Sequence, residues 1–255
     1  MKLFEWLDAR QFLRLRTWDF CFRSITREYG RDFFKKVICR HPIRTIRGIQ
    51  QYRQMKWNES LPDHGKNPGI VKGNIDLSKS IVGVGFCLKP LQPACISGRA
   101  NHDCYFLERG LVHSPKDPPA CCRNCRIKEL GLLSLSSGSR FYIMTSARDI
   151  LYDLILPSLE KKQFTQGVFV ICRYSFEPFN MALLIAGVTA QLFPFEKNDC
   201  QDYPTWLLAD VGIKELQTEV NSQDVNLIQD LFVPINQIDL QRHHFLKNGN
   251  IFYPQ

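Results

Sequence analysis

The amino-acid sequence predicts a three-layer α/β protein, in which a mostly parallel sheet carries helices on both faces. A basic helical arm is expected to precede this domain. Short apolar runs alternate with longer amphipathic stretches from residue 70 to residue 255, which is typical of parallel strands joined by crossover helices. The chain has 255 residues, 44% of them hydrophobic and 23% charged, which is enough for one such domain with an arm.

Residues 1–57 are expected to form the arm as amphipathic helices. Met1 to Lys56 holds 14 Lys and Arg against 5 Asp and Glu, a net charge of +9, whereas the whole chain carries +8. Two helices are expected at 32–39 and 43–55, on either side of Pro42. An earlier helix carries apolar, mostly aromatic side chains between its arginines: Phe12, Leu13, Leu15, Trp18, Phe20 and Phe22.

Two interpretations of the arm stay open. Its basic residues either form a solvated face of helices packed against the domain, or they dock on an acidic partner. A protein partner is the favoured target and a membrane surface the alternative, while nucleic acid is disfavoured because no nucleic-acid motif accompanies the charge. Apolar runs fall short of the roughly 20 residues of a membrane span, and acidic residues near Met1 argue against a signal peptide. A cytoplasmic location, with peripheral membrane contact as an alternative, is therefore expected.

The α/β domain is expected to follow a linker at Asn58 to Asn67, a polar stretch. Four buried strands are predicted at 81–86, 140–144, 167–172 and 190–194. Five helices are predicted at 126–135, 149–161, 178–186, 204–216 and 224–231. Each of the first three helices falls between two consecutive strands, as a crossover helix does.

Six of the ten cysteines fall within one segment of 39 residues: Cys87, Cys95, Cys104, Cys121, Cys122 and Cys125. The two-residue gap between Cys122 and Cys125 lets two sulfurs bind one metal ion or one face of a cluster. Prolines and glycines make segment 87–125 loop-like, and a long irregular segment in a compact domain is generally functional or held by a ligand. The segment therefore predicts a metal centre.

Ligation by sulfur alone suits an iron–sulfur cluster or zinc. A cluster, expected to be 4Fe-4S, is favoured because a zinc ribbon carries two Cys-x2-Cys pairs and this segment has one. Free or redox-active thiols without metal remain the other interpretation. The expected ligands are Cys95, Cys104, Cys122 and Cys125, with Cys87 and Cys121 as alternates.

Polar residues directly follow the expected strands, where ligands gather in open α/β sheets. Thr145 and Ser146 follow the second strand and Arg173 follows the third, which makes these three the candidate cofactor-binding residues. The pair Thr145-Ser146 also suits a helix cap, the commoner role of such a pair. Cys87, Cys172 and Cys200 follow three strands and are expected to share the same edge of the sheet.

The run Cys122-x2-Cys125-x-Ile127-x-Glu129-Leu130, followed by a glycine and a strand, resembles a prokaryotic family of cysteine-rich α/β proteins of unknown function. The likeness covers residues 121 to 172, and the cysteines upstream of it are spaced differently from the family pattern. The resemblance implies an iron–sulfur site and no particular substrate.

These features predict an iron–sulfur protein that acts in a redox reaction, as an oxidoreductase or a subunit of one, or that passes electrons to a partner. The alternative is a non-catalytic, zinc-stabilised adaptor whose basic arm docks a partner. A metal-free thiol enzyme is the third hypothesis, and it requires thiols of low pKa that react readily.

Overall fold

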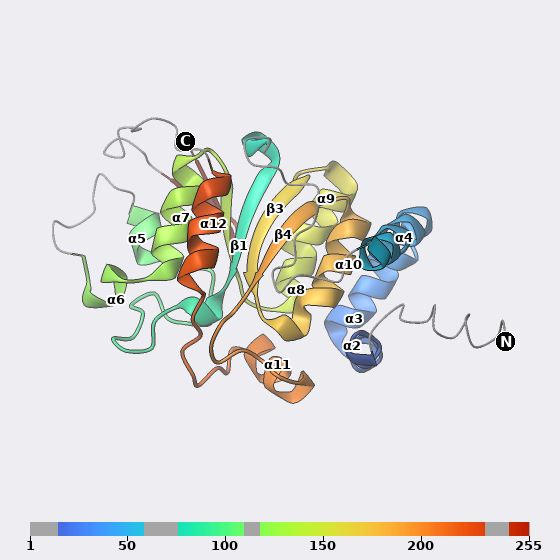
Figure 1. Cartoon of the computed structure of the whole chain (residues 1–255), viewed down its shortest axis with the longest axis horizontal. Coiled ribbons are helices and arrows are strands. Elements are labelled where there is room, and N and C mark those ends of the chain that lie inside the picture. Colours follow the sequence, from blue (N-terminus) through green and yellow to red (C-terminus); the bar gives the residue numbers. More distant parts are fainter. Residues whose placement is uncertain (1–14, 59–75, 110–117, 233–244, 255) are drawn as a thin grey trace.

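In the part of the chain that the structure describes, six strands form one mixed sheet at the centre of the protein (Figure 1). The computed structural model describes residues 15–58, 76–109, 118–232 and 245–254. The strand order is β4-β3-β1-β2-β6-β5, in which the first four strands are parallel and the last two form an antiparallel hairpin beside β2. The strands are β1 (Ser80–Gly85), β2 (Arg140–Met144), β3 (Gln166–Ile171), β4 (Thr189–Pro194), β5 (Leu246–Asn248) and β6 (Ile251–Tyr253).

Two layers of helices cover the sheet because successive strand residues point to opposite faces. On β1, Val82 and Val84 belong to one buried cluster and Ile81 to the other. One face is covered by α5 (Tyr105–Arg109), α7 (Arg126–Ser136) and α12 (Ser222–Leu231). The other is covered by α8 (Ala147–Ile150), η4 (Leu151–Ile155), α9 (Leu156–Lys161) and α10 (Phe176–Ala186). The predicted three-layer α/β fold is confirmed.

The chain reverses its direction of winding between β1 and β3. It passes from β1 to β2 by way of α7 on one face, then crosses to the far side of β1 by way of α8, η4 and α9 on the other. The loops that leave β1 and β3 therefore diverge to opposite faces at the carboxyl end of the sheet. In open α/β sheets, this crevice is where ligands generally bind.

The described part of the arm packs onto the α/β domain. It comprises α2 (Leu15–Ile25), α3 (Glu28–Phe33), η1 (Phe34–Ile38) and α4 (Pro42–Asn58). The α4 helix lies against α10, where a Cβ on Gly48 would come within 2.6 Å of the Ile185 backbone nitrogen. The Nζ of Lys36 donates to the Tyr152 hydroxyl at 2.7 Å, and Val37 is buried in the domain core. These helices therefore pack against the domain, and docking of the arm's basic residues on an acidic partner stays a prediction.

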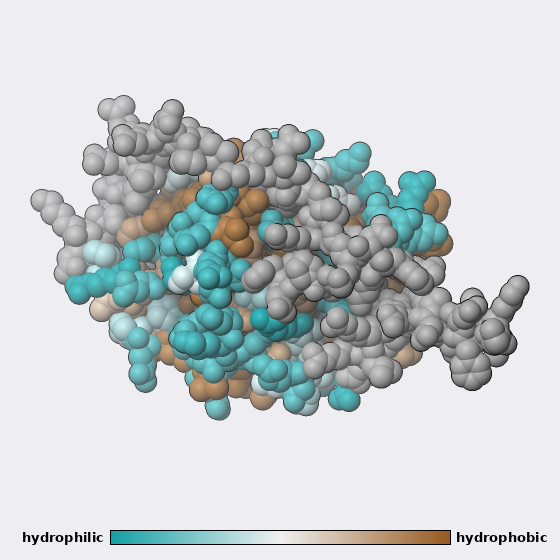
Figure 2. All heavy atoms as spheres, viewed as in Figure 1, coloured by the Kyte–Doolittle hydropathy of each residue, from teal (hydrophilic) through white to brown (hydrophobic). Residues whose placement is uncertain are grey.

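Hydrophobic residues are interspersed with hydrophilic ones on the face of the molecule in Figure 2, and some lie at its lower edge near α11 (Tyr203–Asp210). Val211, Ile213 and Leu216 are exposed in the segment that follows this helix. Every helix in the described part of the chain is too short or too polar to cross a lipid bilayer.

The four predicted parallel strands agree with the structure to within one residue. The predicted helix at 204–216 is too long, because α11 ends at Asp210 and Gly212 then adopts a left-handed φ of +89°. The hairpin of β5 and β6 was not expected. Asn58, the first residue of the proposed linker, is instead the last residue of α4; the rest of the linker, 59–67, and the first helical residues of the arm, 1–14, lie outside the described residues.

Candidate metal centre and the adjoining pocket

Five of the six clustered cysteines line one small cavity beside the sheet, which we call the cysteine cavity: Cys95, Cys104, Cys121, Cys122 and Cys125. Its volume is about 10 Å³, close to the space that one water molecule needs. The Sγ atoms of Cys121 and Cys122 are 3.8 Å apart, and four of the five residues are buried. All four expected ligands therefore line the same cavity, although Cys95 and Cys104 lie well before Cys122 and Cys125 in the chain.

Helix N-termini point at two of these sulfurs. Cys104 immediately precedes α5 and Cys125 is the N-cap residue of α7. The backbone amides two and three residues after each cysteine, which lie in the first turn of the helix, lower the pKa of its thiol. Such amides favour a thiolate over a thiol. The N-termini of both helices therefore stabilise the thiolate form of these cysteines, which is the form that binds a cation.

Burial opposes the effect of these amides, because it favours the protonated thiol over the thiolate. It raises the pKa of the Cys104 thiol to about 11 and that of Cys122 to about 12, and it also raises the pKa of Cys125. Neighbouring thiolates add to the rise, since each cysteine lies near others of the set. At neutral pH these thiols keep their protons unless a cation displaces them. The reactive, low-pKa thiols that a metal-free enzyme would need are not found at these three positions.

A buried ammonium group lies beside the same cavity. Lys89 is only 1% exposed, and its Nζ donates to the carbonyl oxygens of Gly98 at 3.1 Å and Asn101 at 2.8 Å, and also to the Asn101 side chain. Burial lowers its pKa, whereas the nearby Cys95 and Cys104 raise it. Lys89 thus connects the start of the loop to Gly98 and Asn101 by hydrogen bonds, and it places a positive charge beside the sulfurs. No pattern in the sequence singles out Lys89 for this role.

Cys87, the sixth cysteine of the segment, lies apart from the other five. It belongs to the wall of a larger pocket, together with Cys172 and Cys200. Arg99 links the two regions, because its guanidinium donates to the carbonyl oxygen of Cys87 at 3.1 Å and to that of Lys89, which lines the cysteine cavity, at 3.4 Å. The expected gathering of Cys87, Cys172 and Cys200 at one edge of the sheet is therefore found.

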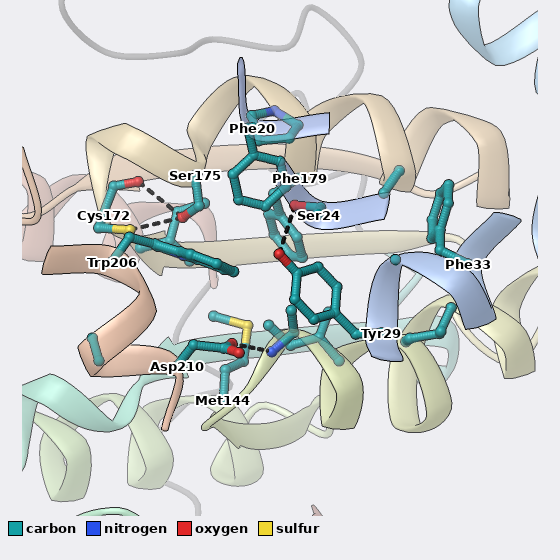
Figure 3. Close-up of a pocket in the computed structure, with 18 of the residues that line it drawn as sticks. Phe20, Ser24, Tyr29, Phe33, Met144, Cys172, Ser175, Phe179, Trp206 and Asp210 are labelled. Carbon is teal, nitrogen blue, oxygen red and sulfur yellow. Dashed lines mark hydrogen bonds between the residues drawn. The ribbon is translucent and has the colours of Figure 1, made fainter. Parts of the chain in front are cut away.

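This larger pocket, which we call the apolar pocket, has a volume of about 280 Å³ and lies at the carboxyl ends of β1, β2 and β3 (Figure 3). It occupies the crevice where the winding reverses. Helices α2 and α3 of the arm cover it from one side and α11 from another. Aromatic rings form much of its wall, and the rings of Phe20 and Trp206 are 4.8 Å apart in an edge-to-face arrangement.

A few polar groups face this apolar surface (Figure 3). The hydroxyls of Ser24 and Tyr29 are 2.6 Å apart. The Asp210 carboxylate accepts a hydrogen bond from the Ala147 amide at 2.6 Å. Burial raises the pKa of Asp210 to about 6, and the nearby Asp149 adds to the rise while the Ala147 amide opposes it.

Asp210→Asn is expected to stabilise the protein at alkaline pH. A folded-state pKa of about 6, against an ordinary value of 3.8, means that the folded protein holds this proton more tightly than the unfolded chain. The resulting stability is present below pH 4 and is lost as the pH rises through about 6. At about 1.4 kcal/mol per pKa unit, asparagine should raise the free energy of unfolding at pH 8 by up to about 3 kcal/mol, and by little at pH 4.

Urea unfolding at pH 4 and pH 8 measures this difference. Glu160→Gln, which removes one negative charge from an exposed position, is the matched control and should change stability equally little at both values. An Asp210→Asn variant with the same pH dependence as the wild type would contradict the prediction.

The three candidate cofactor-binding residues have different surroundings. The Oγ of Ser146 accepts from the Asp149 amide at 3.1 Å and caps α8, while Thr145 and Ser146 both donate to the Asp149 carboxylate. Thr145 also lines the apolar pocket. The side chain of Arg173 is exposed, and its backbone amide donates to Asp199 at 2.7 Å. The capping role is therefore found, and a role in binding a cofactor stays a prediction.

Fold and site together define a doubly wound α/β protein with a cysteine cavity beside the sheet and an apolar pocket at its winding reversal. Comparison with known protein families, with curated proteins and with solved structures finds no match to this chain. The resemblance of residues 121 to 172 to a cysteine-rich family therefore stays an expectation.

Proposed function

We propose that the chain is an iron–sulfur protein, whose cluster is bound by Cys95, Cys104, Cys122 and Cys125 and serves a redox reaction or electron transfer to a partner protein. The observation that carries the proposal is the convergence of five cysteines on one cavity, with the N-termini of α5 and α7 directed at two of the sulfurs. Fe–S clusters are held by cysteine thiolates, and hydrogen bonds to the sulfurs tune their potentials.

The spacing of the sulfurs supports a cluster over a single zinc ion. Four thiolates around one zinc at about 2.3 Å lie about 3.8 Å from one another. Among the described residues, the one group with three ligand atoms all within 4.8 Å of each other lies elsewhere, so no three sulfurs of the cysteine cavity are that close together. In a cluster each thiolate binds its own iron, which suits a wider spacing. The cavity of about 10 Å³ must still expand as a cluster assembles.

A zinc-stabilised adaptor is the second candidate, and one distance favours it. The 3.8 Å between the sulfurs of Cys121 and Cys122 equals the edge of a zinc–thiolate tetrahedron. Zinc would then hold the loop without redox activity, and the exposed basic residues of the arm would dock an acidic partner.

A reducing, cytoplasmic location is part of the proposal. All ten cysteines are free, and clustered free thiols persist where glutathione and thioredoxin keep them reduced. The exposed arginines of α2, α3 and α4 are the proposed contact with an acidic partner protein.

Iron, zinc and acid-labile sulfide, measured with a visible spectrum on protein purified without oxygen, test the proposed function. We expect iron and sulfide in equal amounts, near four of each per chain for a 4Fe-4S cluster, and a broad absorption that bleaches on reduction. Zinc without sulfide would reject the cluster, and loss of that zinc in Cys104→Ser/Cys125→Ser would favour the adaptor. Protein reconstituted with iron and sulfide that still retains neither would reject both metal-centre functions.

A further inference from the structure

We propose that Cys172, Asp199 and Cys200 form a second metal site, which binds one divalent ion of the zinc class and leaves a coordination position open toward the apolar pocket. This site is separate from the cysteine cavity and does not depend on the function proposed for it.

The donor atoms already have the spacing that one ion requires. The two Sγ atoms and a carboxylate oxygen all lie within 4.8 Å of one another, and the three residues are at most 9% exposed. Ligands around a tetrahedral zinc lie about 3.5–3.8 Å apart, so only a small contraction is needed. Two sulfurs and one carboxylate are a donor set that zinc and iron(II) accept and that magnesium and calcium do not prefer.

The fold brings these residues together because β3 and β4 are adjacent and parallel. Cys172 follows β3, while Asp199 and Cys200 lie in the segment after β4. One carboxylate oxygen of Asp199 accepts from the Arg173 amide at 2.7 Å and the other accepts from the Cys200 amide at 2.7 Å. Both amides fix the carboxylate in place, and each oxygen keeps a lone pair for a metal ion.

Charge balance supports an ion at this position. Two thiolates and a carboxylate carry −3, and a divalent ion reduces this to −1. The ammonium of Lys214 lies 3.6 Å from the Sγ of Cys200 and supplies the remaining positive charge. A buried group of charges is tolerated when it is paired in this way, and three uncompensated anions would not be.

The geometry also gives the direction of the open position. Cys172 and Cys200 line the apolar pocket and Asp199 does not (Figure 3 shows Cys172 there). An ion bound by these three residues is therefore open to the pocket on the side of its two sulfur ligands. Three protein ligands with a fourth, exchangeable position are typical of catalytic rather than structural zinc. The ligand class that fits is a small apolar molecule with one thiol, alcohol or carbonyl donor, whose body packs among Phe20, Phe179 and Trp206.

Cobalt(II) titration of the full-length, chelator-treated chain tests the site, because cobalt bound to thiolates gives a charge-transfer absorption. We expect Cys172→Ser/Cys200→Ser to bind one cobalt ion fewer per chain than the wild type, with that absorption reduced accordingly. Asp199→Asn should keep the absorption, since both sulfurs remain, and should weaken binding at this site by roughly tenfold or more. Unchanged stoichiometry in the double variant, or unchanged affinity in a folded Asp199→Asn, would overturn the proposal.

Cys87→Ser is the matched control, because Cys87 is buried in the same wall and lies near Cys200 without belonging to the group. Cys87→Ser should bind as many cobalt ions as the wild type. Loss of one ion would mean that Cys87 is a fourth protein ligand, and it would contradict the proposed open coordination position. Hexanethiol should shift the cobalt spectrum of the wild type and of Cys87→Ser, and the absence of a shift would also overturn it. Cys104→Ser/Cys125→Ser should retain this cobalt ion, so that failure of the cluster and failure of the second site remain distinguishable.

Discussion

Replacing Cys104 and Cys125 together by serine is expected to abolish metal binding at the cysteine cavity. Both sulfurs lie at helix N-termini and point at the same cavity, and a serine hydroxyl is a poor ligand for iron or zinc. A ligand present at 1,000 times its dissociation constant stabilises a protein by about 4 kcal/mol, so the metal-loaded wild type should exceed the variant by at least about that amount. Metal content and thermal unfolding measure the two effects.

Two single variants are the controls for this experiment. Cys39→Ser replaces an exposed cysteine of the arm and should leave both metal content and unfolding temperature unchanged. Cys121→Ser removes the fifth sulfur of the cavity and should keep the metal, because four ligands suffice. A Cys104→Ser/Cys125→Ser protein that still carries its full complement of metal would place the centre elsewhere.

The sequence predicted the sheet well because the strands are buried on both faces. Runs such as Val168 to Ile171 have few polar residues and are bounded by glycine or by polar turns, so a strand is the only element that suits their length. The hairpin at the sheet edge was missed because β5 and β6 have three residues each, and two of the three residues of β5 are exposed. Short, polar edge strands carry little of the hydrophobic pattern that identifies a strand.

The cysteine cavity could be predicted in part from clustering alone. Five of the six cysteines converge as expected, and the sixth, Cys87, does not, because it follows β1 directly and stays at the end of the sheet. The second site offered a weaker signal: Cys172 and Cys200 both follow strands, yet only the pairing of β3 with β4 brings them together. Lys89 and Arg99 could not be singled out, because their partners are backbone carbonyls, which the sequence does not distinguish.

Lys89→Met is expected to destabilise the loop more than any other single change outside the cysteines. Methionine keeps the length of the side chain but removes the donor shared by two carbonyl groups and the Asn101 side chain, all held around a lysine that is 1% exposed. The three hydrogen bonds are partly buried, and a hydrogen bond to a charged group contributes about 1.5–3 kcal/mol, so the free energy of unfolding should fall by roughly 3 kcal/mol. Chemical denaturation of the variant and the wild type measures it.

Lys128→Met is the matched control for this change. Lys128 lines the same cavity, but it is only partly buried and its Nζ donates to one carbonyl, that of Arg123, at 3.3 Å. Its loss should cost no more than about 0.5 kcal/mol, as for other surface substitutions. Because both variants remove one positive charge beside the sulfurs, equal losses of stability would mean that charge, not the hydrogen bonds of Lys89, holds the loop. A larger loss for Lys89→Met alone would identify these hydrogen bonds as what closes the loop around the cysteines.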